Sequence, residues 1–197
     1  MQKLRTVDLT LAAMFIALMA IGANITSWAP FLQVAGVPLS MQPFFAILAG
    51  LLLGSRLGSL SMIVYLLVGI AGAPVFAQFQ GGFGTIMSPT GGFLLAFVVV
   101  AYVTGKIIEM KKNPKFGTFL AASLVGIILI YLIGTNYMYF AVNNWMGGSI
   151  SYAAVWKAMA WFSVKDLAFT ILGAVIAPRI YRAVSRTSVS VSRKHTA

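Results

Sequence analysis

The sequence lacks most of the residue types that catalysis and covalent cross-linking require. It contains no cysteine, a single histidine (His195) and only three acidic residues among 197. A disulfide-stapled scaffold is therefore excluded, and a metal site has almost no ligands to draw on. Paired carboxylates for acid–base chemistry are missing, and no G-x-x-x-x-G-K-[ST] loop is present to bind ATP phosphates. We expect neither an enzyme nor a resident cofactor or metal.

Charge is scarce as well. Charged residues make up 9% of the chain, hydrophobic residues make up 60%, and the mean hydropathy is +0.93. Ordinary soluble domains have roughly 25% charged residues and need them to cover their surface, and a disordered chain would be far less hydrophobic. The basic residues do not form a single cluster, so nucleic-acid binding is not expected. We predict an all-α integral membrane protein.

Six apolar runs divide the chain. A helical span needs about 20 mostly apolar residues, and we predict one six-helix domain over residues 1–197, with a polar tail from about residue 184. The predicted spans are Val7–Ser27, Met41–Leu53, Leu57–Gly69, Gly92–Ile108, Phe116–Val142 and Tyr152–Tyr181. The second and third are short, so we expect unusual ends or pairing there. We interpret the first run as a retained helix rather than a signal peptide, because Asp8 interrupts its basic start and no clear A-x-A site follows.

The basic residues test this count, because positive charges favour cytoplasmic loops. The outer loops of a six-span chain, at residues 31–40, 73–89 and 143–151, contain no Lys, Arg, Asp or Glu. Twelve of the 14 basic residues fall on the other side: Lys3, Arg5, Arg56, Lys106, Lys111, Lys112, Lys115, Arg179, Arg182, Arg186, Arg193 and Lys194. A five- or seven-span chain would place some of these outside. We predict a multi-pass protein of the cell membrane with both termini in the cytoplasm.

Three further charged residues fall in the last span: Lys157, Lys165 and Asp166. Asp166 precedes Arg179 by thirteen residues, which at ~1.5 Å per residue is roughly 20 Å from the inner boundary. Charges at such depth mark a ligand pathway or a buried pair. Adjacent helical residues point about 100° apart, so Lys165 and Asp166 need not bridge each other. The alternatives are an ion pair that locks this helix to its neighbours, or a lysine that snorkels to the outer surface; Lys157 either snorkels or caps a cavity mouth.

The segment from Gly72 to Phe93 is unlike a span. Glycines permit positive φ and a close approach of backbone to a ligand, and Pro89 and Thr90 are suited to begin a helix whose free N–H groups can receive an anion. Aromatic rings interleaved with amides suit a small amphipathic ligand. We predict an irregular ligand-covering loop before the fourth helix, with a plain external loop as the alternative. Its candidate ligand-facing residues are Phe76, Gln78, Phe79, Gly81, Gly82, Thr90, Gly91 and Phe93.

Small residues recur four apart at two places, at Ala13 and Ala17 and again at Gly50, Gly54 and Gly58. Such faces let helices approach closely, either within one chain or between chains.

Several runs, taken together, resemble a known family. They are Val37–Gln42, Leu48–Gly54, Tyr65–Gly69, Gly72–Ala77, Gly81–Gly82 and Pro89–Leu94. They resemble the BioY family, the biotin-specific substrate-capture (S) components of energy-coupling factor (ECF) transporters. The resemblance implies a membrane protein that captures external biotin with high affinity and takes it up with an energising module, a transmembrane coupling protein and two ATPases. Ala13 and Ala17 match the Ala-x-x-x-Ala face by which such S components contact the coupling protein.

The last helix departs from the family pattern Gly-Asp-Leu-x-Lys. This chain has Lys165, Asp166, Leu167, Ala168 and Phe169, so the aspartate is kept while lysine stands in the glycine position and phenylalanine in the lysine position. The loop also carries Gln78, Phe79 and Gln80 where smaller residues are common. Lys165 or Lys157 then takes over the role of the missing lysine.

The resemblance implies how biotin would be held. Asp166 would accept from a ureido N–H, with amides such as Gln42, Gln78 or Asn136 completing that ring's hydrogen bonds. Phe79, Phe93, Tyr137 and Trp161 are candidates to pack on the thioether ring, and Lys165 or the N–H groups near Thr90 and Gly91 would meet the carboxylate. Alternatives are an S component for a different vitamin, an autonomous channel or carrier that uses Asp166 as its proton site, and a structural membrane subunit.

Overall fold

The computed structural model describes residues 5–25, 27, 33–34 and 37–194. The chain is helical apart from two short paired strands. In chain order the elements are α1 (Thr6–Asn24), β1 (Gln33–Val34), β2 (Val37–Pro38), α2 (Gln42–Ile70), the 3-10 turn η1 (Ala77–Phe79), α3 (Phe83–Met87), α4 (Gly91–Glu109), α5 (Phe116–Asn144) and α6 (Tyr152–Lys194). The strands pair antiparallel, with Val34 opposite Val37; the sequence predicted only a loop there.

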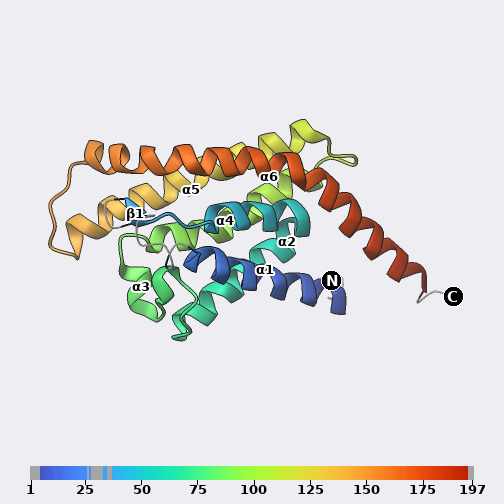
Figure 1. Ribbon diagram of the computed structural model, residues 1–197, viewed down its shortest axis with the longest axis horizontal. Coiled ribbons are helices and arrows are strands. Elements are labelled where there is room, and N and C mark those ends of the chain that lie inside the picture. Colours follow the sequence, from blue (N-terminus) through green and yellow to red (C-terminus); the bar gives the residue numbers. More distant parts are fainter. Residues whose placement is uncertain (1–4, 26, 28–32, 35–36, 195–197) are drawn as a thin grey trace.

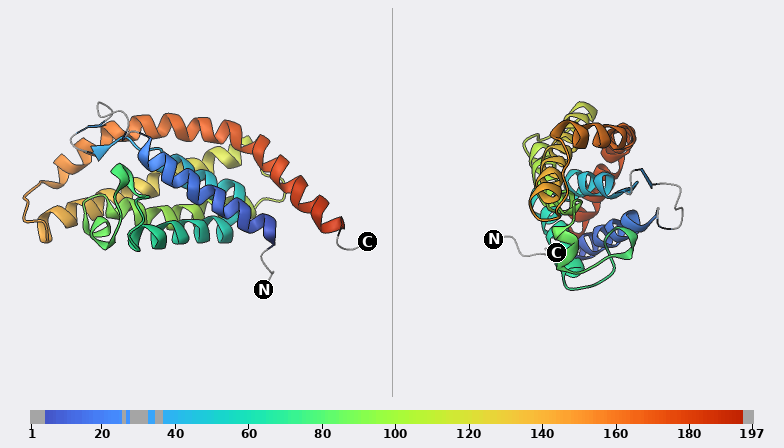
Figure 2. Two further views of the ribbon diagram at one scale, coloured as in Figure 1. Left: turned by 60° about the horizontal axis from the view of Figure 1, so that its bottom comes forward. Right: turned by 90° about the vertical axis from the view of Figure 1, so that its left-hand side faces the viewer.

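The helices form an elongated bundle. Helix α1 packs on α2, α2 on α4, α4 on α5, and α6 runs along α5 (Figure 1). The start of α1 and the end of α6 lie at one end of the molecule, whereas α3 and the connection between α5 and α6 lie at the other (Figure 2). The two ends of the bundle are therefore built from different connections, and only one of them carries the segment before α4.

Within the described residues, five helices are long and apolar enough to cross a membrane: α1, α2, α4, α5 and the Tyr152–Ala183 part of α6. The prediction of an all-α membrane protein is confirmed, and the predicted first, fourth and fifth spans agree with α1, α4 and α5 to within a few residues. Within the predicted polar tail, residues 184–194 continue α6 as a helix. Helix α6 is bent before its C-terminal part (Figure 1). Pro178 lies within this helix and lacks a backbone N–H donor, which is a common cause of kinks.

The predicted second and third spans lie in one element, α2, which is broken at Gly54. This glycine has φ 82° and ψ 177°, far from helical values. A Cβ on Gly58 would lie 3.0 Å from the carbonyl oxygen of Ala49, although nine residues of straight helix would separate the two positions by about 13 Å. The chain therefore doubles back at Gly54, and α2 consists of two short legs packed against each other.

A carboxylate from α4 holds this break. Glu109 Oε1 accepts the backbone N–H of Ser55 at 2.7 Å, and Glu109 Oε2 accepts the Ser55 hydroxyl at 2.8 Å. The second leg thereby receives an acceptor for a backbone donor that a helix start leaves unpaired. We call Glu109, Ser55 and Gly54 the hairpin clasp.

The row of Gly50, Gly54 and Gly58 packs inside the chain. Gly50 lies against Thr104 and Ala101 of α4, Gly54 against Glu109, and Gly58 against the first leg of α2. Of the two alternatives for this row, close packing within the chain is the one observed.

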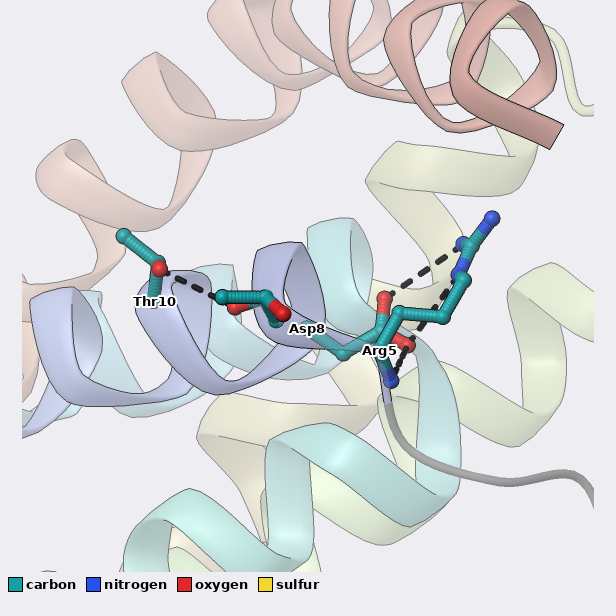
Figure 3. Close-up of polar contacts among 4 residues, drawn as sticks. Arg5, Asp8 and Thr10 are labelled. Carbon is teal, nitrogen blue, oxygen red and sulfur yellow. Dashed lines mark hydrogen bonds and ion pairs between the residues drawn. The ribbon is translucent and has the colours of Figure 1, made fainter. Parts of the chain in front are cut away.

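Helix α1 begins with its own acid–base pair. Asp8 Oδ2 accepts the backbone N–H of Arg5 at 3.0 Å and lies 3.4 Å from Arg5 Nε, while the Thr10 hydroxyl donates to a backbone carbonyl at 3.0 Å (Figure 3). An acidic side chain in the first turn complements the helix dipole. This pair lies at the surface, at the opposite end of the bundle from α3.

Candidate functional site

A cavity of about 360 Å³ lies at the α3 end of the bundle. Its size is in the range of pockets that hold small molecules. It is walled by the starts of α2 and α4, by the segment from Phe76 to Pro89, by the second half of α5 and by the first half of α6. The lining residues are Ser40, Gln42, Pro43, Phe76, Ala77, Gln78, Gln80, Thr85, Ser88, Pro89, Thr90, Phe93, Leu94, Phe97, Tyr131, Met138, Met159, Phe162, Lys165 and Asp166.

The charged part of the wall comes from α6 and is held by two other elements. Lys165 Nζ lies 2.7 Å from Asp166 Oδ1, so the neighbours do bridge each other. The Tyr131 hydroxyl of α5 donates to Asp166 Oδ2 at 2.7 Å, and Lys165 Nζ also donates to the carbonyl oxygen of Ser40, just before α2. The pair is thus both an ion pair that links α6 to its neighbours and a part of the cavity wall.

Asp166 keeps acceptor capacity for a ligand. The residue is only 6% exposed, and each of its carboxylate oxygens receives one bond from a described residue. A carboxylate offers about four acceptor positions. A ligand N–H that enters the cavity can therefore bond to Asp166 without displacing Lys165 or Tyr131.

A second polar chain runs behind the wall. Gln42 Nε2 donates to the Tyr65 hydroxyl at 2.9 Å, and this hydroxyl donates to the carbonyl oxygen of Val75, also at 2.9 Å. Gln42 is buried. Since no described side chain donates to its Oε1, Gln42 presents an acceptor at a fixed position on the cavity side.

The segment before α4 turns sharply at Gln78 and Phe79. Both have left-handed backbone angles, with φ 60° and 55°, which L-residues other than glycine adopt at a cost. Gln78 lines the cavity, whereas Phe79 points away and is 50% exposed. Phe76 is buried against Tyr65, with ring centroids 5.5 Å apart. The turn thus directs the Gln78 amide and the Phe76 ring toward the cavity and the Phe79 ring away from it.

The part of the cavity wall next to α3 and α4 contains both polar and aromatic side chains. The Thr90 and Ser88 hydroxyl oxygens lie 3.0 Å apart, and the Thr90 side chain does not cap α4. Phe93, one turn into α4, packs edge-to-face on Tyr131 with centroids 6.2 Å apart. Hydroxyls and the start of α4 therefore form one part of the wall, and an aromatic pair connects it to the charged part.

The structure brings half of the predicted ligand-facing residues together. Gln42, Phe76, Gln78, Thr90, Phe93, Lys165 and Asp166 line the cavity. The other half lie elsewhere: Phe79, Gly81, Gly82, Gly91, Asn136, Tyr137 and Trp161 do not line it.

These outlying residues have structural surroundings of their own. Trp161 is 66% exposed. Asn136 bonds within its own helix and accepts from the Tyr152 hydroxyl. The Tyr137 hydroxyl donates to the carbonyl oxygen of Ile86 at 2.6 Å and so holds α3.

The three glycines shape the segment rather than face the cavity. Gly82 has φ 89° and its N–H donates to the carbonyl oxygen of Gly69 at 2.7 Å. Gly81 and Gly91 lie directly against the backbone carbonyls of Ala73 and Ile86, where a Cβ has no room.

Sequence reasoning missed the rest of the wall, above all Tyr131. Met159 and Phe162 share a helical face with Asp166 at spacings of three and four residues, so that spacing was a usable signal. Tyr131 lies in an apolar run where a tyrosine is indistinguishable from a core residue. Lys157 is exposed and does not line the cavity.

Ala13 and Ala17 are exposed on α1, while Ala12, Phe15 and Met19 on its other face are buried. Of the residues predicted to orient the chain, Lys3 lies outside the described residues, as do the side chains of Arg186, Arg193 and Lys194. The single histidine, His195, also lies outside them. Within the described part of the chain, no group of three His, Cys, Asp or Glu side chains could hold a metal.

Comparisons with known proteins identify the family and the fold. A family model described as "BioY family" matches residues 1–186. The chain is 51% identical to a Bacillus subtilis protein named "Putative biotin transporter BioYB" over 98% of this chain and 96% of that one. It is 35% identical to the Thermotoga maritima "Biotin transporter BioY" over 86% and 92% of the two chains. A crystal structure of the S-component for biotin from an ECF-type ABC transporter shares the fold, with a TM-score of 0.75 and 23% identity over 91% of this chain and 95% of that one.

Proposed function

The chain belongs to the BioY family, and from this premise we propose that it is a membrane subunit that captures external biotin and mediates its uptake. Its relatives are named as transporters, a function that needs no catalysis. The observation that carries the proposal is the cavity of about 360 Å³, in which a half-buried Lys165 and a buried Asp166 form an ion pair that faces apolar and aromatic walls.

Biotin has the chemistry that this cavity complements. It is a fused ureido and thioether ring system with an apolar tail that ends in a carboxylate. A largely apolar pocket with a few fixed polar groups suits such a molecule. Phe93, Phe97 and Phe162 supply apolar faces for the rings.

The Lys165–Asp166 pair is assigned to the ureido ring. Since Lys165 Nζ and Asp166 Oδ1 are 2.7 Å apart, both contact the same end of a ligand. A ureido group has N–H donors for Asp166 and a carbonyl acceptor for Lys165, which has three donors in all. Gln42 and Gln78 are positioned on the same wall to complete these bonds.

The carboxylate of biotin then belongs at a different part of the wall. Thr90, Ser88 and the N–H groups at the start of α4 are the available donors there. A helix N-terminus favours an anion through its unpaired N–H groups and its dipole.

The orientation of the chain follows from its charges. Arg5 starts α1, Arg56 follows the break of α2, and Lys106 lies in the last turn of α4. All three lie at the end opposite the cavity. Helix α4 begins at the cavity and is about 28 Å long, which places Lys106 at the far end. Arg56 adjoins Ser55, which bonds to Glu109 at that same end, and α1 begins at the end of the bundle opposite α3 (Figure 1). The positive-inside rule puts that end in the cytoplasm. Both termini are then cytoplasmic, the two legs of α2 count as separate segments of a six-helix chain, and the cavity faces outward.

Uptake requires an energy source that this chain does not supply. The partners we assign are an ECF coupling protein and two ATPases, with the exposed Ala13 and Ala17 of α1 as the face that contacts the coupling protein.

Titration of the purified protein with biotin, with riboflavin and thiamine as controls, tests the proposal. We expect saturable binding of biotin alone. Saturation by another vitamin and not by biotin would instead identify an S component of different specificity. Uptake into vesicles that contain this chain without ATPase partners would identify an autonomous carrier.

A further inference from the structure

The last residue of α1 reaches the cavity wall through a buried side chain. Asn24 is 6% exposed. Its Oδ1 accepts the backbone N–H of Phe79 at 2.6 Å, and its Nδ2 donates to the carbonyl oxygen of Ala20 at 2.9 Å. Both ends of the amide are therefore used, and the bond to Ala20 directs the oxygen toward the turn that follows Ala77.

This turn is stabilised in part by a partner outside it. Gln78 and Phe79 both have left-handed φ values without being glycine, and such residues stay in that region only where their surroundings hold them. Within the turn, the N–H of Phe76 donates to the carbonyl oxygen of Gln80 at 3.0 Å, and the N–H of Gln80 donates to the carbonyl oxygen of Ala77 at a long 3.3 Å; neither bond uses the N–H of Gln78 or Phe79. The short bond from Phe79 to Asn24 ties the strained pair to a different element.

The strained conformation decides which side chain faces the cavity. Ala77, Gln78 and Gln80 line it, while Phe79 between them points away. If Gln78 and Phe79 relaxed to backbone angles with negative φ, their side chains would point in other directions, and Gln78 would leave the cavity wall.

We propose that Asn24 is a positioning residue for ligand capture, which holds Gln78 in the cavity wall through its hydrogen bond to the Phe79 N–H. Asn24 itself does not line the cavity. The inference rests on the proposed function, because biotin is the ligand whose affinity reports it. The buried acceptor oxygen and the two left-handed residues assign the role to Asn24 independently of the Lys165–Asp166 pair.

The experiment is a biotin titration of wild type, Asn24→Ala and Asn144→Ala. Asn144 is the matched control, since its Nδ2 also donates four residues back, to Phe140, at 2.9 Å, but at an exposed position. Loss of one buried hydrogen bond and of the turn it holds should weaken biotin binding by about tenfold in Asn24→Ala, and Asn144→Ala should match wild type. Equal affinity of Asn24→Ala and wild type would overturn the proposal.

Two further variants separate positioning from general stability. Glycine adopts left-handed angles freely, so Phe79→Gly should restore most of the affinity in the Asn24→Ala background. Gln78→Ala should weaken binding by itself and add little to Asn24→Ala, because the two act through one contact. Absence of rescue together with additive losses would contradict the role.

If Asn24→Ala does not fold, Asn24→Asp and Asn24→Leu decide. Aspartate keeps the acceptor oxygen for the Phe79 N–H but loses the donor to Ala20, and leucine loses both. The leucine variant should therefore lose more affinity than the aspartate variant, and equal losses would overturn the inference. Failure of the proposed function has a different signature, because wild type itself would then not bind biotin. The same variants would in that case be compared with the vitamin that does bind.

Discussion

Two carboxylates of this apolar chain lie toward opposite ends of α4, and their surroundings differ: Asp166 of α6 is buried, whereas the Glu109 side chain is 42% exposed. At the start of α4, Asp166 lines a cavity beside Lys165 and Tyr131. At its end, Glu109 accepts the backbone N–H and the hydroxyl of Ser55 in the hairpin clasp and lines no part of that cavity. The difference lies in the available space: one carboxylate has acceptor capacity next to an opening, and the other closes a backbone break.

The comparison refines the rule that a charge at membrane depth indicates a functional site. Only three acidic residues are present, and Asp8 and Glu109 both serve helix starts. Asp8 pairs with Arg5 at the partly exposed start of α1, and Figure 3 shows the contacts between them. The carboxylates of Asp8 and Glu109 lie at the end of the bundle opposite the cavity, so Asp166, which adjoins the cavity, is the candidate ligand contact.

The largest expected effect is on biotin affinity in Asp166→Asn. The substitution keeps the shape but removes the charge, and a charge-assisted hydrogen bond contributes ~1.5–3 kcal/mol. Biotin binding should therefore weaken by about one to two decades in a titration. Asp8→Asn is the control and should bind like wild type. Unchanged affinity in Asp166→Asn would remove the functional half of the comparison.

A smaller effect, on the stability of the protein rather than on biotin affinity, is expected for Glu109→Ala. The second leg of α2 loses its acceptor at Ser55, and loss of a helix cap costs ~1–2 kcal/mol. Denaturation in detergent should show this loss of stability, whereas the biotin affinity of the folded protein should stay within about twofold of wild type. Glu109→Gln, which keeps one acceptor oxygen, should lie between the two. A large loss of affinity with normal stability would show that the clasp belongs to the site.

The helices could be predicted from the sequence, because the length of each apolar run and the helix-breaking residues between the runs indicate where a helix begins and ends. The prediction separated Leu53 from Leu57, and the structure has its left-handed Gly54 between them. It did not anticipate Glu109 as the partner of this break, because the bond joins residues 54 positions apart. Such pairings depend on how helices pack, which one sequence does not specify.

The charged residues of the candidate site could be predicted from the sequence, because charge is rare in an apolar span. Which of the aromatic residues face the cavity could not be predicted in the same way, because this depends on their position around the helix. Lys165 and Asp166 stand out as charges in an apolar span, yet their mutual bridge depends on how the flexible lysine stem folds back. Trp161 precedes Asp166 by five residues, about 140° away around a helix, and the structure leaves it 66% exposed. Phe162, one residue later, lies on the cavity face.

The smallest expected effect concerns the partner that the sequence did not reveal. Tyr131→Phe removes the hydroxyl that donates to Asp166 at 2.7 Å and keeps the ring that packs on Phe93. One hydrogen bond contributes about 1 kcal/mol net, so biotin affinity should fall about fivefold. Trp161→Ala removes a larger side chain on the outer face and should change affinity less than about twofold. If Trp161→Ala weakened binding more than Tyr131→Phe did, the ligand would lie outside this cavity, and the contrast between the two ends of α4 would no longer explain which carboxylate binds it.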